Sequence, residues 1–242
     1  MANAMHAPSP RIIPPDVLLL AYRSGVFPMA DSRDDDEVFW VEPRRRAILP
    51  LDGFHCSRSL AKVIRQDRFR VTVDADFGAV VDACAQPRPE PGAESGQSGT
   101  WISHTIAASY RNLHRHGHAH SVECWQDDRL VGGLYGVAFE RVFCGESMFS
   151  RADNASKVAL AWLVALMRRA GFMLLDCQFM TGHLASLGAT EIDRERYLEL
   201  LAKACDRPPL CSLPEARRAL DQASASSSSP GKLIAQSLTQ TS

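Results

Sequence analysis

The apolar positions along this chain change their spacing several times, and each spacing predicts a different element. Residues 118–149 form three predicted strands, largely apolar and separated by short turns, a pattern typical of an antiparallel meander. Residues 154–171 repeat apolar side chains at helical spacing and end in Gly171, so they predict the longest helix. Residues 172–179 predict a buried strand, and residues 194–204 predict a further helix.

The N-terminal part predicts a small domain of its own. Residues 14–25 predict a short helix that begins near Pro15 and ends at Gly25, and residues 38–43 and 47–51 predict two short strands. We therefore expect a small N-terminal domain at residues 1–52 and a larger domain at residues 53–207.

The C-terminal part predicts no packed structure. Residues 208–242 include the stretch SASSSSPGK and carry few large apolar side chains, so we expect a flexible tail. The predicted fold class is α+β, with a mostly antiparallel sheet flanked by helices.

Composition narrows the class of protein. The 242 residues are 45% hydrophobic, enough for a substantial core, and the formal net charge of -1 provides no global basic field for nucleic acid. The 7 cysteines form no CxxC pair, which argues against a zinc ribbon or a disulfide framework. No signal peptide and no membrane-spanning apolar run is evident, so we expect a soluble cytoplasmic protein.

Three polar residues lie inside apolar strands. Glu146 interrupts the run FCGESMFS, and Asp176 and Gln178 lie two residues apart in LLDCQF, so their side chains are expected on one face. Burying a charge is costly unless it is paired or used. A single buried carboxylate favours a structural salt bridge, whereas two carboxylates and an amide in one sheet favour a site.

Two helical faces carry further candidates. The first is an apolar stripe, which is either plain core or the wall of a pocket beside the acidic strands; it comprises Leu160, Leu163, Val164 and Met167. The second is a basic face at residues 58–65, which is either a solvated surface or a phosphate-contacting patch. It comprises Arg58, Lys62 and Arg65, with Arg44, Arg45 and Arg46 as an extension.

The histidine-rich stretch HRHGHAH is a weak metal signal. It carries His114, His116, His118 and His120, but Gly117 interrupts it at a predicted helix-to-strand junction, so the four rings need not converge. We predict no metal site.

Several motifs together resemble the bacterial leucyl/phenylalanyl-tRNA–protein transferases. They are YRSGVFPM, GTWIS, GHAHSVE, LVGGLYGV, FCGESMFSRADNASK, LLDCQ and HLASLGA, in the order of that family, from about residue 15 to 204. The resemblance implies an acetyltransferase-like (acyl-CoA N-acyltransferase-like) catalytic domain without metal, coenzyme A or other cofactor. It also implies transfer of Leu or Phe from aminoacyl-tRNA to proteins that begin with Arg or Lys, which marks them for N-degron proteolysis.

The resemblance also implies roles for single residues. Glu146, Asp176 and Gln178 fall on the catalytic positions, with Glu146 facing a cationic acceptor, and Trp101 and Tyr110 fall near the terminal adenosine. The basic face at 58–65 falls on the tRNA-contacting patch. The aminoacyl pocket is implied to comprise Leu134, Phe143, Leu160, Leu163, Met167 and Leu175.

Departures from the family's pattern affect the expected donor. Met29 stands where the family commonly has Trp, and Leu163 and Met167 stand where better-known members have Phe. Flexible aliphatic walls adapt to several side chains. We therefore expect Leu as the preferred donor, with Phe and Met accepted. Separately, we expect a monomeric enzyme.

Two alternatives remain at the level of sequence. A coenzyme A-dependent N-acetyltransferase would need a glycine-containing pyrophosphate loop, but the junction SRADNASK has no glycine. A non-catalytic module that binds tRNA or peptide would not need Asp176 and Gln178.

Overall fold

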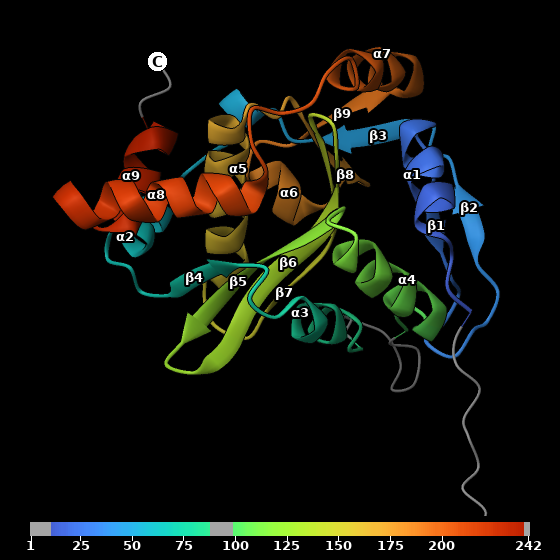
Figure 1. The fold of residues 1–242 in the computed structure, drawn as a ribbon, viewed down its shortest axis with the longest axis horizontal. Helices are drawn as coiled ribbons and strands as arrows, with labels where there is room; N and C mark the ends of the chain where they lie inside the picture. The colour runs from blue at the N-terminus through green and yellow to red at the C-terminus, as the bar shows by residue number, and fades with distance from the viewer. Residues whose placement is uncertain (1–10, 88–98, 240–242) are drawn as a thin grey trace, which may run out of the picture.

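A seven-stranded sheet organises the computed structural model, which describes residues 11–87 and 99–239 (Figure 1). The strand order is β4-β5-β6-β7-β8-β3-β9, and every neighbouring pair is antiparallel except β7 and β8. The predicted α+β class with a mostly antiparallel sheet is therefore confirmed. The strands of this sheet are β3 (Arg45–Ile48), β4 (Arg70–Val73), β5 (Ala119–Gln126), β6 (Arg129–Phe139), β7 (Val142–Ser150), β8 (Leu174–Gln178) and β9 (Thr190–Asp193).

The predicted meander forms the middle of the sheet. Strands β5, β6 and β7 pair consecutively through tight turns, and Asp127 and Glu140 take positive φ angles of 52° and 41° in those turns. Short polar side chains such as Asp tolerate this left-handed backbone, which explains the Asp-Asp turn after β5.

Strand β3 joins the N-terminal residues to the large sheet. It lies between β8 and β9, with Ala47 opposite Gln178 and Ile48 opposite Asp176. We predicted this strand as part of a domain at residues 1–52, but its hydrogen bonds belong to the large sheet. Within residues 11–50, the elements outside the large sheet are α1 (Pro15–Arg23) and the two-stranded sheet of β1 (Phe27–Met29) and β2 (Phe39–Val41).

Helices cover both faces of the large sheet. On one face α5 (Ala155–Ala170) packs with α2 (Arg58–Arg65), and on the other α3 (Phe77–Cys84) and α4 (His104–Arg115) pack beside α1 (Figure 1). Ser57 caps α2 by accepting a hydrogen bond from the Leu60 amide, and α5 ends at Gly171 as predicted, with a φ of 75°. Further elements between residues 51 and 204 are η1 (Leu51–Gly53), α6 (Gly182–Ser186) and α7 (Arg194–Ala204).

The C-terminal segment is folded, so the predicted flexible tail is wrong for residues 213–239. Helix α8 (Leu213–Ser227) begins with a capping box between Ser212 and Glu215, and α9 (Pro230–Thr239) follows it. The apolar faces of these helices lie in the same core cluster as α5. The buried residues are Leu213, Ala216, Leu220, Ile234, Ala235 and Leu238.

Candidate active site

A β-bulge places Glu146 at the centre of the candidate site. Tyr135 of β6 lies opposite Ser147, but the next residue, Gly136, lies opposite Gly145, so Glu146 is the extra residue of β7. A bulge re-aims a side chain without ending the strand. This explains how a carboxylate is accommodated in an otherwise apolar strand.

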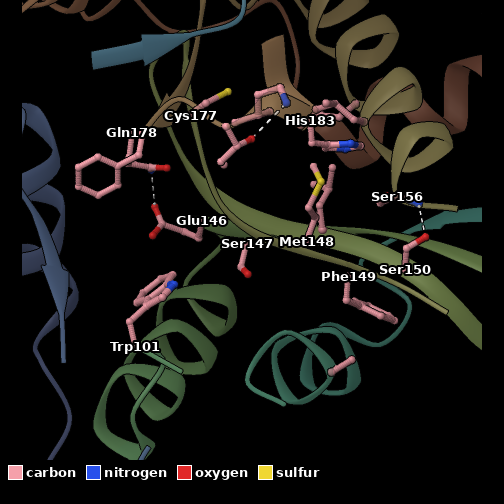
Figure 2. Close-up of a pocket in the computed structure, with 18 of the residues that line it drawn as sticks. Trp101, Glu146, Ser147, Met148, Phe149, Ser150, Ser156, Cys177, Gln178 and His183 are labelled. Carbon is pink, nitrogen blue, oxygen red and sulfur yellow. Dashed lines mark hydrogen bonds between the residues drawn. The ribbon is translucent and has the colours of Figure 1, made fainter. Parts of the chain in front are cut away.

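The Glu146 carboxylate accepts hydrogen bonds on both oxygens. The Tyr110 hydroxyl donates to Oε2 at 2.8 Å. The Gln178 side-chain amide donates to Oε1 at 3.3 Å (Figure 2). Since the Tyr110 proton is used on Glu146, the contact of 2.6 Å between the Tyr110 and Tyr22 hydroxyls has Tyr22 as the donor. Burial raises the pKa of Glu146 to about 7, while the hydroxyl groups of Tyr22 and Tyr110 oppose that rise.

Asp176 is sealed inside the protein beneath this site. Its Oδ1 accepts from Arg46 Nε at 2.8 Å and from the Gln178 backbone amide at 3.0 Å. Its Oδ2 accepts from Arg46 Nη2 at 2.6 Å and from the Tyr197 hydroxyl at 3.0 Å. Asp176 and Arg46 are 0% and 1% exposed, so this is a fully buried, bidentate ion pair.

Gln178 ends β8 in a left-handed conformation, with a φ of 55°. Such a conformation is costly for a residue with a side chain and persists only when the surroundings hold it. The bond from its backbone amide to Asp176 does so, and it leaves the side-chain amide directed at Glu146. Asp176 and Gln178 therefore contact different partners, although we expected their side chains to point together.

A cavity of about 700 Å³ opens beside Glu146 and Gln178. Figure 2 shows Glu146 and Gln178 pointing toward each other at one end, Trp101 below them, and Met148 and His183 farther along. The aliphatic part of the lining comprises Leu134, Leu160, Leu163, Leu175 and Leu184. The cavity thus combines an apolar wall with the carboxylate of Glu146 and the amide of Gln178, and Gln86, Arg151 and His183 also line it.

His183 is a cavity residue that sequence analysis missed. Its Nε2 is buried and has no hydrogen-bond partner within residues 11–87 and 99–239. Burial and the nearby Lys157 ammonium lower the pKa of His183, so the ring is neutral near pH 7. The sequence signal was its position in HLASLGA, directly after the strand that carries Gln178.

The basic face of α2 is solvent-exposed, as predicted. Arg58, Lys62 and Arg65 are exposed, and α9 packs against the same helix through its buried side. The expected extension is only partly present, because Arg46 is buried against Asp176 and Arg45 pairs with Glu191.

Two histidines of HRHGHAH, His114 and His120, lie 3.9 Å and 2.6 Å from the Asp74 carboxylate. His114, His116 and His120 direct Nδ1 to the Ala119 carbonyl, the Asn112 carbonyl and the Asp74 carboxylate, respectively. Among the residues placed by the structure, no group of three or more His, Cys, Asp or Glu side chains is arranged to hold a metal ion.

Two family models account for most of the chain. Residues 12–44 match the model of the leucyl/phenylalanyl-tRNA protein transferase N-terminal domain, and residues 48–202 match the leucyl/phenylalanyl-tRNA protein transferase model. The chain belongs to this family.

Curated transferases of this family are similar over much of their length. One from Novosphingobium aromaticivorans is 57% identical and covers 96% of this chain and 98% of its own. One from Zymomonas mobilis is 60% identical over 80% of this chain and 70% of its own. A solved structure of a functionally unknown protein from Staphylococcus epidermidis is 9% identical, covers 77% of this chain and 67% of its own, and has a TM-score of 0.36, too low to support an argument.

The aminoacyl pocket expected for the transferase family coincides in part with the cavity. Leu134, Leu160, Leu163 and Leu175 line it, whereas Phe143 and Met167 are 0% exposed and lie outside the lining. They pack in the core cluster behind the wall.

The two residues expected near the transferase adenosine differ in position. Trp101 lines the cavity, but Tyr110 is 0% exposed and lies behind Glu146. Tyr110 therefore does not line the cavity, and its contact with adenosine stays a prediction. The spacing of α4 places Tyr110 on the core side, where its hydroxyl orients the carboxylate.

Proposed function

We propose that this protein transfers a leucyl group, and also phenylalanyl and methionyl groups, from aminoacyl-tRNA to the N-terminal amine of an acceptor protein. The observation that carries the proposal is a single cavity in which an apolar wall meets Glu146 and Gln178. Membership of the transferase family supports the donor and acceptor classes. Acceptors that begin with Arg or Lys, and degradation of the product, are the specific form that we propose.

The apolar wall suits the donor side chain. Leu134, Leu160, Leu163 and Leu175 offer no partner for a charged group, so a charged donor would lose its hydration without compensation. An apolar site also discriminates among apolar side chains by about 1–3 kcal/mol per methylene-sized misfit. We propose that this wall selects the donor and that Trp101 lies beside its terminal adenosine.

The polar end suits a cationic acceptor. The carboxylate of Glu146 lines the cavity, where it would attract an N-terminal ammonium group. Gln178 lies within hydrogen-bond distance of Glu146. The donor ester is already activated toward amines, so alignment of the two substrates is the main requirement and is worth roughly 7–11 kcal/mol. Asp176 contributes by holding Gln178 rather than by touching either substrate.

We also propose the acyl-CoA N-acyltransferase type of fold for the catalytic part, at residues 53–207 together with β3. A single parallel pair, β7–β8, within an otherwise antiparallel sheet supports it, and the cavity opens where that pairing ends at Cys144 and Asp176. A monomeric, cytoplasmic enzyme is part of the proposal. None of the helices that the structure describes is long and apolar enough to cross a membrane.

The test is a competition among donors. Equal amounts of Leu-, Phe-, Met- and Arg-charged tRNA are incubated with the protein and one Arg-initiated peptide, and mass spectrometry identifies the transferred residue. We expect Leu to dominate, Phe and Met to be transferred less, and Arg to be refused. Preferred transfer of Arg, or no transfer from any tRNA, would reject the proposed function.

A variant pair sharpens the assignment of the wall. Leu163→Phe is expected to narrow the cavity and to lower transfer of Phe more than transfer of Leu, by about tenfold or more. Leu166→Phe is the matched control, because Leu166 is 1% exposed on the same helix but does not line the cavity. An equal change of the Phe-to-Leu ratio in both variants would reject Leu163 as a wall residue.

A further inference from the structure

We propose that Glu146, and not the Asp176–Gln178 pair, accepts the proton that the acceptor amine releases during the transfer. The proposal rests on the proposed function and assigns one step within it. It follows from which of the three polar side chains faces the cavity with a group able to take a proton.

Asp176 has no unoccupied acceptor position for that proton. Each of its oxygens already accepts two hydrogen bonds, from Arg46, Tyr197 and the Gln178 backbone amide. It is completely buried and does not line the cavity. Protonation there would also leave the guanidinium of Arg46 buried beside a neutral group, which is strongly unfavourable.

Gln178 faces the cavity but is an amide, which has no titratable site in the physiological range. Its side-chain NH₂ group donates to Glu146. Its oxygen can therefore accept a hydrogen bond from the amine and orient it, but it has no means of retaining the proton.

Glu146 meets both requirements. It lines the cavity, and the protein surrounds its oxygens with donors only, from Tyr110 and Gln178. The Tyr22–Tyr110 pair fixes the carboxylate from behind, so an oxygen lone pair remains directed at the cavity. A carboxylate held in this way binds the ammonium form and takes one proton from it, which leaves the nitrogen neutral and able to attack.

The groups that face Glu146 set its proton affinity. They are Tyr22 of α1, Tyr110 of α4, Gln178 and Asp176 of β8, and Arg46 of β3. Burial raises the pKa of Glu146 to about 7, close to the reference value of about 8 for an α-amine. Proton transfer between groups so closely matched is opposed by only about tenfold, and a base near the working pH is the most effective.

The step balances without a further reactant. The acceptor ammonium first gives one proton to Glu146, and the neutral amine nitrogen then forms a bond to the ester carbonyl carbon. The bond from that carbon to the ribose oxygen breaks as the second proton of the nitrogen passes to the departing oxygen, and Glu146 releases its own proton to water. The carboxylate is thereby restored for the next acceptor.

The test uses single-turnover transfer with Leu-charged tRNA and saturating Arg-initiated peptide between pH 5.5 and 8. The wild-type rate is expected to rise with pH and to level off above about pH 7. Glu146→Gln is expected to lower the maximal rate by about 100-fold or more and to remove that inflection. Tyr110→Phe is expected to move the inflection to higher pH, because it removes a donor that stabilises the anion.

Glu123→Gln is the control for removing a buried carboxylate. Glu123 is 0% exposed and is bonded to Ser121 and Thr72 outside the cavity, so the inflection should stay in place. If Glu146→Gln keeps the wild-type maximal rate and inflection and only raises KM for the peptide, Glu146 merely binds the ammonium and the inference is wrong. A wild-type protein that transfers nothing would instead reject the proposed function itself.

Discussion

Asp176 illustrates how a residue can support a candidate site without facing its cavity. Two hydrogen bonds at each oxygen join it to the Arg46 guanidinium, the Tyr197 hydroxyl and the backbone of Gln178. Arg46 in turn donates to the Gly25 carbonyl and lies over the rings of Phe27 and Tyr197. The ion pair therefore links the turn at Gly25 with β3, β8 and α7.

At this scale we predict that Asp176→Ala is strongly destabilising. It leaves the Arg46 charge buried without a partner, and breaking a buried pair in this way costs about 3–5 kcal/mol. The double variant Arg46→Met/Asp176→Leu should recover much of that stability but not the transfer rate, because Gln178 still lacks the acceptor that holds its backbone. Urea unfolding and single-turnover transfer measure the two effects.

The control for this prediction is the neighbouring ion pair between β3 and β9. Arg45 pairs with Glu191 at 3.1 Å, and both side chains are largely exposed. Glu191→Ala should therefore cost less than about 1 kcal/mol. Equal losses of stability from Asp176→Ala and Glu191→Ala would contradict the structural role given to the buried pair.

Sequence reasoning found the polar residues of the site but not how they are connected. Glu146, Asp176 and Gln178 stood out because each interrupts an apolar strand. Arg46 did not, since nothing in the triplet RRR distinguishes its last member from its exposed neighbours. The bulge was equally hidden, because FCGESMFS has too little regular alternation of apolar and polar residues to show where one extra residue shifts the pattern.

At the scale of elements, helices with a strong apolar period were predicted well and the C-terminal helices were not. Serine-rich composition suggested disorder, yet Leu213, Ala216 and Leu220 recur at a spacing that buries one face of α8. The capping box in SLPE was a local signal for its start. A few apolar side chains were sufficient because α5 already offered a surface to cover.

We predict that Leu220→Ala destabilises the protein by about 2–5 kcal/mol, because Leu220 is 2% exposed in the shared core. Leu210→Ala is the matched control: Leu210 is 84% exposed, and its loss should change the free energy of unfolding by less than about 0.5 kcal/mol. Thermal unfolding checks both. Indistinguishable melting temperatures would mean that α8 does not contribute to the folded core in solution.

At the scale of the whole molecule, the balance of charge requires tRNA to be recognised locally. The formal net charge is -1, so attraction to phosphates must come from clusters such as the exposed face of α2. The C-terminal helix α9 packs on the other side of α2 and so supports that face from within the protein.

We predict that reversing Arg58, Lys62 and Arg65 to Glu weakens tRNA binding and makes its salt dependence shallower, because fewer counterions are released. Reversing Arg194, Arg196 and Lys203 on α7 produces the same change in net charge at another exposed helix. Binding titrations at several salt concentrations compare the two. Equal weakening by both triplets would assign the effect to net charge and not to α2.

The bulge in β7 also has an evolutionary meaning. With Glu146 left out, Phe143 and Met148 would still pack in one core and Cys144 and Phe149 in the other, as they do now. Both sets of apolar side chains would therefore keep their faces without this residue. In this sense Glu146 corresponds to a one-codon insertion in the hairpin. Deleting the Glu146 codon in frame would remove the carboxylate and leave the paired residues on either side in their present register.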